Sequence, residues 1–390
     1  MTFGHDMLAY WALDPDVTYL NHGTVGVVPR RVLAAQQEIR DAIERQPSQF
    51  LLRELASFGA SLGQGSRMRQ AAARVAAFLG ARGQDVVFVD NATAGANAVL
   101  RSLAIDAGDD ILVTDHGYGG VTRAAEFIAR ERGATVRVVA VPYPAFDAAA
   151  LVARVGEAIG PRTKLALIDH VTSESALVLP LADIASACRD RGVLVLADGA
   201  HAPGALALDI PALGVDFYVA NLHKWAHAPR SCGILWSASA HQEQLHPPVI
   251  SWGLDEGFTQ EFDWVGTRDP SAWLAAPEGI AFLEEMGFDA VRTYNHDLAW
   301  QSARSLTGAW GTALEIDEST VGTMVTIALP GAAGDTAEGA KELRTALLDE
   351  DRIEVQMHAG YGRIWARISA QVYNEPSDVE RLRDAVVRRG

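Results

Sequence analysis

The sequence has few cysteines, few lysines and no long apolar run. Two cysteines, Cys188 and Cys232, cannot form a disulfide framework or a four-cysteine metal site. Acidic residues outnumber basic ones by 49 to 33, and the formal net charge is −16. Nucleic acids and anionic membranes require clustered positive charge, so neither partner is predicted. Aspartate, proline or glycine interrupts each apolar run before the ~20 residues that a membrane span needs, so no membrane segment is predicted.

The start of the chain and its composition indicate the class of protein. Residues 1–16 place no basic segment ahead of an apolar core, so no signal peptide is expected and a cytoplasmic location is predicted. Hydrophobic residues make up 49% of the chain and charged residues 21%, which is a globular balance. At ~150 residues per domain, the 390 residues allow roughly two to three domains.

From about residue 70, helical patterns alternate with short apolar runs. Such alternation indicates βαβ units and a largely parallel sheet. The apolar run 233–236 follows the preceding run too closely for a crossover helix, so it is expected to be an antiparallel strand. Strands are predicted at 86–89, 110–114, 135–141, 165–168, 193–197, 217–220 and 233–236, and helices at 67–79, 94–103, 120–132 and 182–191.

The pattern changes after about residue 270, where helices are grouped around few strands. Helices are predicted at 272–286, 290–306, 337–350 and 377–388, and strands at 323–329 and 363–369. This arrangement is typical of a smaller α+β domain. The predicted organisation is a large α/β domain over residues 15–265 and a small α+β domain made of residues 1–14 and 266–390.

Polar residues follow the carboxyl ends of the predicted strands. In an open parallel sheet these ends share one edge, where ligands bind, so the groups are expected to form one site. They are Asn91-Ala92-Thr93, Asp115-His116, Asp169-His170, Asp198 and, four residues past its strand, Lys224.

The first of these segments predicts an anion site. Asn91-Ala92-Thr93-Ala94-Gly95 leads from a strand into a helix, and its small residues allow a close approach to the backbone. Free N–H groups at the helix start, with the Thr93 hydroxyl, are suited to a phosphate. Neither a nucleoside-triphosphate P-loop nor a dinucleotide glycine motif is present.

A buried carboxylate and a lone lysine complete a recognisable set. Asp198 ends an apolar strand and needs a partner, which a protonated pyridine nitrogen would supply. Lys224 can form a Schiff base with a cofactor aldehyde and then move protons. Of the three lysines, Lys164 begins a strand at the opposite edge of the sheet and Lys341 lies on a charged helix face. The set predicts an enzyme that uses pyridoxal 5'-phosphate.

The chain resembles the class V aminotransferase family of fold-type-I pyridoxal-phosphate enzymes, in particular its isopenicillin N epimerase-like branch. The resemblance extends from Tyr19 to Asn374. It implies a large, mostly parallel sheet of the seven-stranded type with a smaller C-terminal domain. The motifs that carry it are NATAG (91–95), DHGYGG (115–120), DHVTSESALVLP (169–180), ADGAHAPG (197–204), NLHKW (221–225) and GTRDP (266–270).

The resemblance implies a role for each matching residue. Lys224 would be the Schiff-base lysine and Asp198 the partner of the pyridine nitrogen. His116 would stack on the opposite face of the ring and is the second candidate catalytic residue. Around the cofactor it further implies His201 and Ser173 near the phenolic oxygen and Ala92, Thr93, Asn221 and His223 at the phosphate.

The resemblance also implies a substrate side and an assembly. Arg367 would hold the α-carboxylate of an amino-acid substrate, with Asn21, His22 and Tyr118 nearby. Thr267 would reach the phosphate of a neighbouring subunit, which predicts a homodimer with shared active sites. No metal is predicted, because no carboxylate or cysteine completes a ligand set with His223, His227, His241 and His246.

Three departures from the family pattern bear on the reaction. Ala92 removes one hydroxyl from the phosphate site, and Ser173 replaces an asparagine of the cysteine desulfurases. No cysteine lies ~15 residues before Arg367, and Cys188 and Cys232 are expected to be packed in the core. From these departures the chain is predicted not to be a cysteine desulfurase.

The fold alone does not determine the reaction. We expect a C–S lyase acting on an S-substituted cysteine in thiol or secondary metabolism, because removal of the α-proton and loss of the β-sulfur group need Lys224 alone. An epimerase of the isopenicillin N type is the alternative, and it needs a second acid, for which His116 or Tyr118 is the candidate. Transamination, decarboxylation-coupled deamination and a non-catalytic protein that binds the cofactor or an amino acid are the further alternatives.

Overall fold

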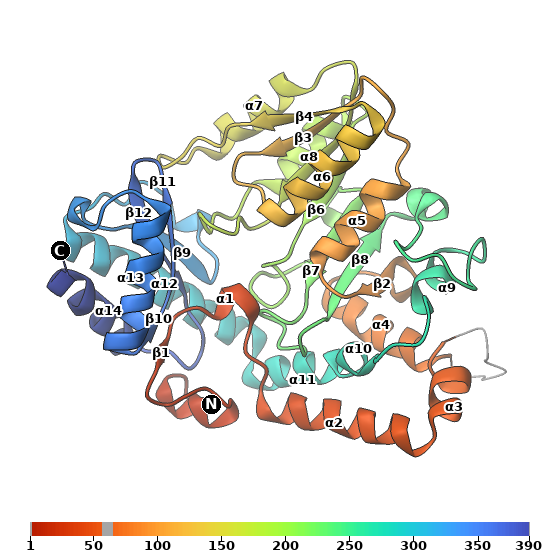
Figure 1. Ribbon diagram of the computed structural model, residues 1–390, viewed down its shortest axis with the longest axis horizontal. Coiled ribbons are helices and arrows are strands. Elements are labelled where there is room, and N and C mark those ends of the chain that lie inside the picture. Colours follow the sequence, from red (N-terminus) through yellow and green to blue (C-terminus); the bar gives the residue numbers. More distant parts are fainter. Residues whose placement is uncertain (1, 57–64, 390) are drawn as a thin grey trace.

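A mixed sheet of seven strands organises the larger part of the chain (Figure 1). The computed structural model describes residues 2–56 and 65–389. The strand order is β2-β8-β7-β6-β5-β3-β4, and only β8 runs antiparallel to its neighbours, as predicted. The strands are β2 (Val86–Val89), β3 (Asp110–Thr114), β4 (Thr135–Val139), β5 (Thr163–Asp169), β6 (Leu194–Asp198), β7 (Phe217–Asn221) and β8 (Gly233–Ser237).

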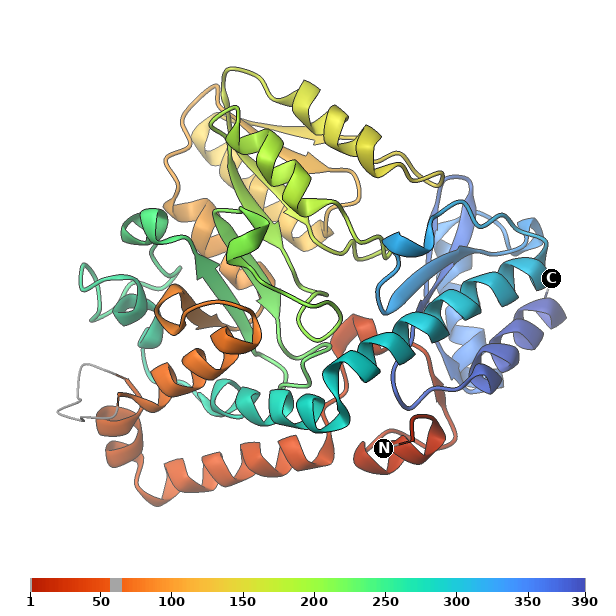
Figure 2. The same ribbon diagram turned by 180° about the vertical axis from the view of Figure 1, so that it is seen from behind.

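Helices cover both faces of this sheet (Figures 1 and 2). Val87 and Val89 of β2 pack into the core beneath α5 and α6, whereas Val86 and Phe88 pack into the core beneath α4, α7 and α8. Because both faces are buried, the strand reads as an uninterrupted apolar run. The covering helices are α4 (Arg67–Phe78), α5 (Ala92–Ser102), α6 (Gly119–Arg132), α7 (Ala148–Ala158) and α8 (Leu181–Arg189).

The C-terminal part contains a three-stranded antiparallel sheet with its own core. Its strands are β9 (Met324–Ala328), β11 (Gln356–Gly360) and β12 (Arg363–Ser369), and its helices are α12 (Phe288–Trp310), α13 (Ala337–Asp351) and α14 (Pro376–Arg389). The helix predicted over 272–286 is two helices, α10 (Ser271–Leu274) and α11 (Ala276–Met286). Pro277 lies in the first turn of α11, where its missing N–H is tolerated, and it prevents one continuous helix.

The N-terminal segment packs against the C-terminal part. β1 (Thr18–Tyr19) pairs in parallel with β10 (Ile353–Glu354), and Met7 and Trp11 share a core with Phe282 and Tyr373. The sequence analysis did not predict α2 (Arg30–Arg45), α7 or β11. The division into two domains stays a prediction. The remaining short elements are η1 (His5–Tyr10), α1 (His22–Val25), α3 (Pro47–Gln49), η2 (Phe50–Glu54), η4 (Gly83–Asp85), η5 (Pro211–Leu213), η6 (Ser239–Gln244), α9 (Phe258–Asp263), η7 (Glu318–Thr320) and η8 (Gly331–Ala333).

The sheet brings the polar residues at its carboxyl edge together. Asp169 and Asp198 end neighbouring parallel strands in register, and Asn221 ends the next strand. This edge faces the C-terminal part of the chain, so ligands bound there would contact both parts. Among the described helices, none is long and apolar enough to cross a membrane.

Candidate active site

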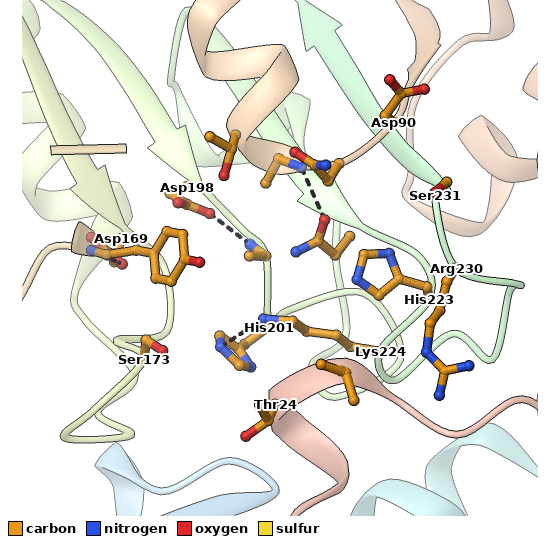
Figure 3. Close-up of a pocket in the computed structure, with 17 residues that line it drawn as sticks. Thr24, Asp90, Asp169, Ser173, Asp198, His201, His223, Lys224, Arg230 and Ser231 are labelled. Carbon is orange, nitrogen blue, oxygen red and sulfur yellow. Dashed lines mark hydrogen bonds between the residues drawn. The ribbon is translucent and has the colours of Figure 1, made fainter. Parts of the chain in front are cut away.

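A cavity of about 500 Å³ lies at the carboxyl edge of the sheet (Figure 3). A second cavity of about 460 Å³ shares Thr24, Tyr118, Ser173 and Lys224 with it. The two cavities therefore adjoin at these residues, and the lysine lines both. The carboxylates of Asp169 and Asp198 lie to one side of Lys224, and His223, Arg230 and Ser231 to the other.

Lys224 is almost completely buried, with 8% of its surface exposed. Its Nζ lies 3.0 Å from His201 Nε2. Burial and, second, the positive charge of Arg367 lower the pKa of Lys224 to about 7, against the opposing effect of Asp198 and Asp169. Burial also lowers the pKa of His201 well below its usual value, so His201 is neutral, and it hydrogen-bonds the lysine through Nε2. A neutral amine is thus available near neutral pH.

The backbone of the lysine loop is fixed by the N-terminal segment. His22 is fully buried, and its Nε2 donates to the carbonyl of Lys224 at 3.0 Å. A Cβ at Gly26, where φ is 68°, would collide with the carbonyl oxygen of His223. Glycine is therefore required where the end of α1 meets this loop.

Asp169 and Asp198 form a pair of buried carboxyl groups. Asp198 Oδ1 accepts from the N–H of Ala200 at 3.0 Å, and Asp169 Oδ1 accepts from the N–H of Tyr118 at 3.3 Å. Within the described part of the chain, the Oδ2 atom of each has no partner. Burial raises the pKa of both groups, and the charge of Asp198 raises that of Asp169 further. A cationic partner at this end of the cavity would relieve that cost.

The start of α5 leaves fewer free N–H groups than the sequence suggested. Asn221 Oδ1 accepts from the N–H of Ala92 at 2.9 Å, and Asn91 Oδ1 caps the N–H of Ala94 at 2.9 Å. Gly95 donates to the Asn91 carbonyl. Of residues 92–95, only Thr93 has an N–H without an intramolecular partner. Thr93 is therefore the residue at this helix start whose N–H is left for an anion.

Arg367 reaches the second cavity from β12. Its Nη1 donates to the carbonyl of Ser173 and its Nη2 to Thr24 Oγ1, both at 2.6 Å. Only 3% of its surface is exposed, and its Nε–H has no partner in the described structure. The guanidinium is thus held rigidly with donor capacity left over.

The other predicted site residues do not all line the two cavities. His116 and Tyr118 line the second cavity with Lys224, and Tyr118 lines the first as well. Asn21 and His22 are buried and line neither cavity, whereas their neighbour Thr24 lines both. Thr267 is exposed and lies on a separate surface hollow, so it does not join the cavity of its own chain.

Among the residues at or beside the cavities that were not predicted, four bear on the chemistry. Asp169 was noted at the sheet edge but not assigned to the site, and Thr24 directly follows the Asn21-His22-Gly23 motif. Arg230 lines the cavity six residues after Lys224. Tyr361 contacts His116 from the turn after β11, and the sequence showed no strand there.

The residues present fit pyridoxal phosphate. His223 and Arg230 lie at one end of the first cavity, where Arg230 supplies positive charge, and Thr93 lines the same cavity with a free N–H. The buried Asp198 has an unpaired oxygen at the other end, which suits a protonated pyridine nitrogen. The amine of Lys224 lies between the two ends (Figure 3). This donor set matches a phosphate, a cationic ring nitrogen and an aldehyde.

The sequence pattern described as Aminotransferase class-V matches residues 19–382. The chain therefore belongs to the class-V aminotransferase family, as the motifs predicted. The family indicates an enzyme with pyridoxal phosphate as cofactor and with the fold-type-I architecture of the seven-stranded sheet.

Two relatives show which proteins the chain is similar to. It is 34% identical to a probable chloroplastic L-cysteine desulfhydrase of Arabidopsis thaliana, over 96% of this chain and 83% of that protein. It is 33% identical to isopenicillin N epimerase of Streptomyces clavuligerus, over 96% of this chain and 95% of that protein.

One prediction requires correction. The chain was expected not to be a cysteine desulfurase, because no cysteine precedes Arg367. A solved cysteine desulfurase from Thermococcus onnurineus NA1 has the same fold over 100% of this chain and 98% of its own, with a TM-score of 0.79 and 19% sequence identity. The exclusion was therefore wrong, because a missing cysteine does not separate this chain from proteins that share its whole architecture. Both cysteines are buried, as expected.

Proposed function

We propose that the protein is a pyridoxal-phosphate-dependent C–S lyase that acts on an S-substituted L-cysteine. The products would be a thiol, pyruvate and ammonia, with one water consumed. The observation that carries the proposal is the single buried amine of Lys224 between the two cavities, with a pKa of about 7. The relationship to proteins named L-cysteine desulfhydrase supports it.

Each step has a residue suited to it. When bound, the cofactor accepts the electron pair left at Cα. Lys224 Nζ takes the α-proton as a neutral amine, and the β-sulfur group then leaves. His201 orients this amine through the hydrogen bond between Nε2 and Nζ. Arg367 holds the α-carboxylate, and Thr93, His223 and Arg230 hold the cofactor phosphate.

A deuterium experiment separates this function from its nearest alternative. In deuterated water, an S-substituted L-cysteine should release thiol, pyruvate and ammonia. Release of none of these, with recovery of D-amino acid labelled at Cα, would refute the lyase. Epimerisation is the second candidate because the exposed Tyr118 lines both cavities and a relative of 33% identity is an epimerase.

The setting of the enzyme is part of the proposal. Thr267, exposed beside Arg268, would reach the phosphate of a partner subunit and complete a homodimer with shared active sites. The protein would act in the cytoplasm, in thiol or secondary metabolism. Its substrate would be an amino acid, because Arg367 would bind a carboxylate and the cofactor beside it would bond to an amine.

A further inference from the structure

His116 is held by both of its ring nitrogens. Nδ1 lies 2.6 Å from Ser175 Oγ, and Nε2 lies 2.5 Å from the hydroxyl of Tyr361. The ring is partly buried and lines the second cavity together with Lys224. An imidazole makes its hydrogen bonds in the ring plane, at the two nitrogens. With both occupied, only the faces and the carbon edges of the ring remain for a ligand.

The direction of the hydrogen bonds determines which nitrogen carries the hydrogen. The N–H of Leu177 donates to Thr172 Oγ1 at 2.8 Å. That hydroxyl lies 2.7 Å from Ser175 Oγ but 3.4 Å from the Leu177 carbonyl, so its hydrogen is assigned to Ser175. The Ser175 hydrogen then points to Nδ1 of His116. Nδ1 accepts, and Nε2 therefore carries the hydrogen and donates it to Tyr361.

Tyr361 occupies a backbone position that tyrosine disfavours. Gly360 pairs with Arg363, so Tyr361 and Gly362 form a two-residue hairpin loop between β11 and β12. Both loop residues have positive φ, 52° and 72°. Such loops favour asparagine, aspartate and glycine. A strained residue points to a requirement for its side chain, and the contact with His116 is one.

The surroundings favour a neutral ring. Burial lowers the pKa of His116, against the opposing charge of Asp115. The ring of Tyr143 packs against both His116 and Tyr361, with centroid separations of 5.0 and 5.1 Å. His358 is itself held neutral by burial, with a pKa of about 4. The titratable groups near His116 and its partner Tyr361 are Asp115, Tyr143, Glu174 and His358.

We infer that Ser175 and Tyr361 are positioning residues that fix His116 as a neutral ring with its hydrogen on Nε2, directed at Tyr361 and away from the substrate. The ring then shapes the cavity and supplies no proton to Cα. The inference rests on the proposed function and deepens it, because it leaves Tyr118 as the candidate second acid for epimerisation.

Nitrogen NMR of the holoenzyme with ¹⁵N-labelled histidine tests the inference without any turnover. The His116 signal is identified by its loss in His116→Asn. We expect the Nε2–H form, unchanged between about pH 5 and pH 8, the range in which histidine usually titrates. Tyr361→Phe should raise the pKa of His116 toward 6.5, because the ring loses a partner and gains water. Tyr143→Phe removes a hydroxyl from the same aromatic group without touching those bonds, and should match the wild type.

Two results would overturn the inference. One is an Nδ1–H form in the wild type, and the other is a His116 titration that is the same with and without the Tyr361 hydroxyl. Kinetics supply a further check, since general acid or base catalysis contributes about 10²–10⁴-fold. His116→Phe keeps a flat ring, so kcat should fall by less than about tenfold, whereas a fall of more than about a hundredfold would also refute the inference. If no S-substituted cysteine reacts, the proposed function fails. The NMR result still tests the tautomer of His116, because it needs no turnover.

Discussion

Replacing Arg367 by lysine tests the proposed carboxylate site most directly. Arg367 makes three contacts with its own chain: to the Ser173 carbonyl and Thr24 Oγ1 at 2.6 Å and to Asn21 Oδ1 at 3.5 Å. A guanidinium has five N–H groups, so five minus three leaves two, one of which is the unpaired Nε–H. The other is on Nη1, and it does not form a fork with the Nε–H, which shares its edge of the guanidinium with Nη2. Bidentate binding of a carboxylate therefore needs Nη2 to give up its contact with Thr24 or Asn21.

Lysine keeps the charge but offers a point-like ammonium in place of the planar fork. One of the two charged hydrogen bonds to the substrate would be lost, which costs about 1.5–3 kcal/mol. That corresponds to a weakening of substrate affinity by about 10- to 150-fold. Arg367 lines only the second cavity, whereas Asp198 and Thr93 line the first, so cofactor binding and absorbance should be unchanged.

The assay compares KM for an S-substituted L-cysteine with KM for its methyl ester, which lacks the carboxylate. Arg367→Lys should raise KM for the acid by the factor above and leave KM for the ester nearly unchanged. Arg363→Lys, an exposed substitution on the same strand, is the matched control and should leave both alone. Equal KM values for the acid in wild type and Arg367→Lys, with normal cofactor absorbance, would refute the reasoning.

Four further predictions follow from the site and its charges. Borohydride reduction of the holoenzyme should attach the cofactor to the peptide that contains Lys224, and a label on Lys164 would contradict the assignment. Thr93→Val should weaken cofactor affinity by about tenfold or more, the cost of one hydrogen bond to a charged group, measured by absorbance titration. Burial raises the folded-state pKa of Asp169 above its ordinary 3.8, so the folded protein binds that proton more tightly than the unfolded chain does. Asp169 therefore removes stability as the pH rises from about 4 through neutral, so the unfolding free energy of cofactor-free Asp169→Asn should shift in favour of the variant, relative to the wild type, over that range. If Thr267 completes a partner's site, sedimentation should give a dimer, and a fully active monomer would speak against it.

The elements that could be predicted are those whose pattern is local. The strands at 86–89, 110–114 and 363–369 have the predicted bounds. The first two contain short apolar runs next to aspartates, and the third begins directly after Gly362. The helix over 272–286 was predicted too long, because Pro277 starts a new helix. The strand β11 was not predicted, because its polar and glycine residues form no apolar run.

The sequence by itself determined that Lys224, Asp198 and Thr93 lie at one edge, since the carboxyl ends of parallel strands meet there. The roles of these residues stay predictions. Tertiary structure alone decided that the side chain of Asn221 accepts a hydrogen bond from the N–H of Ala92, 129 positions away. It also decided that the hydroxyl of Tyr361 hydrogen-bonds His116, 245 positions away. Hydrogen bonds between such distant residues leave no periodic trace in a single sequence, because they depend on how separately folded elements pack and not on the pattern of either one.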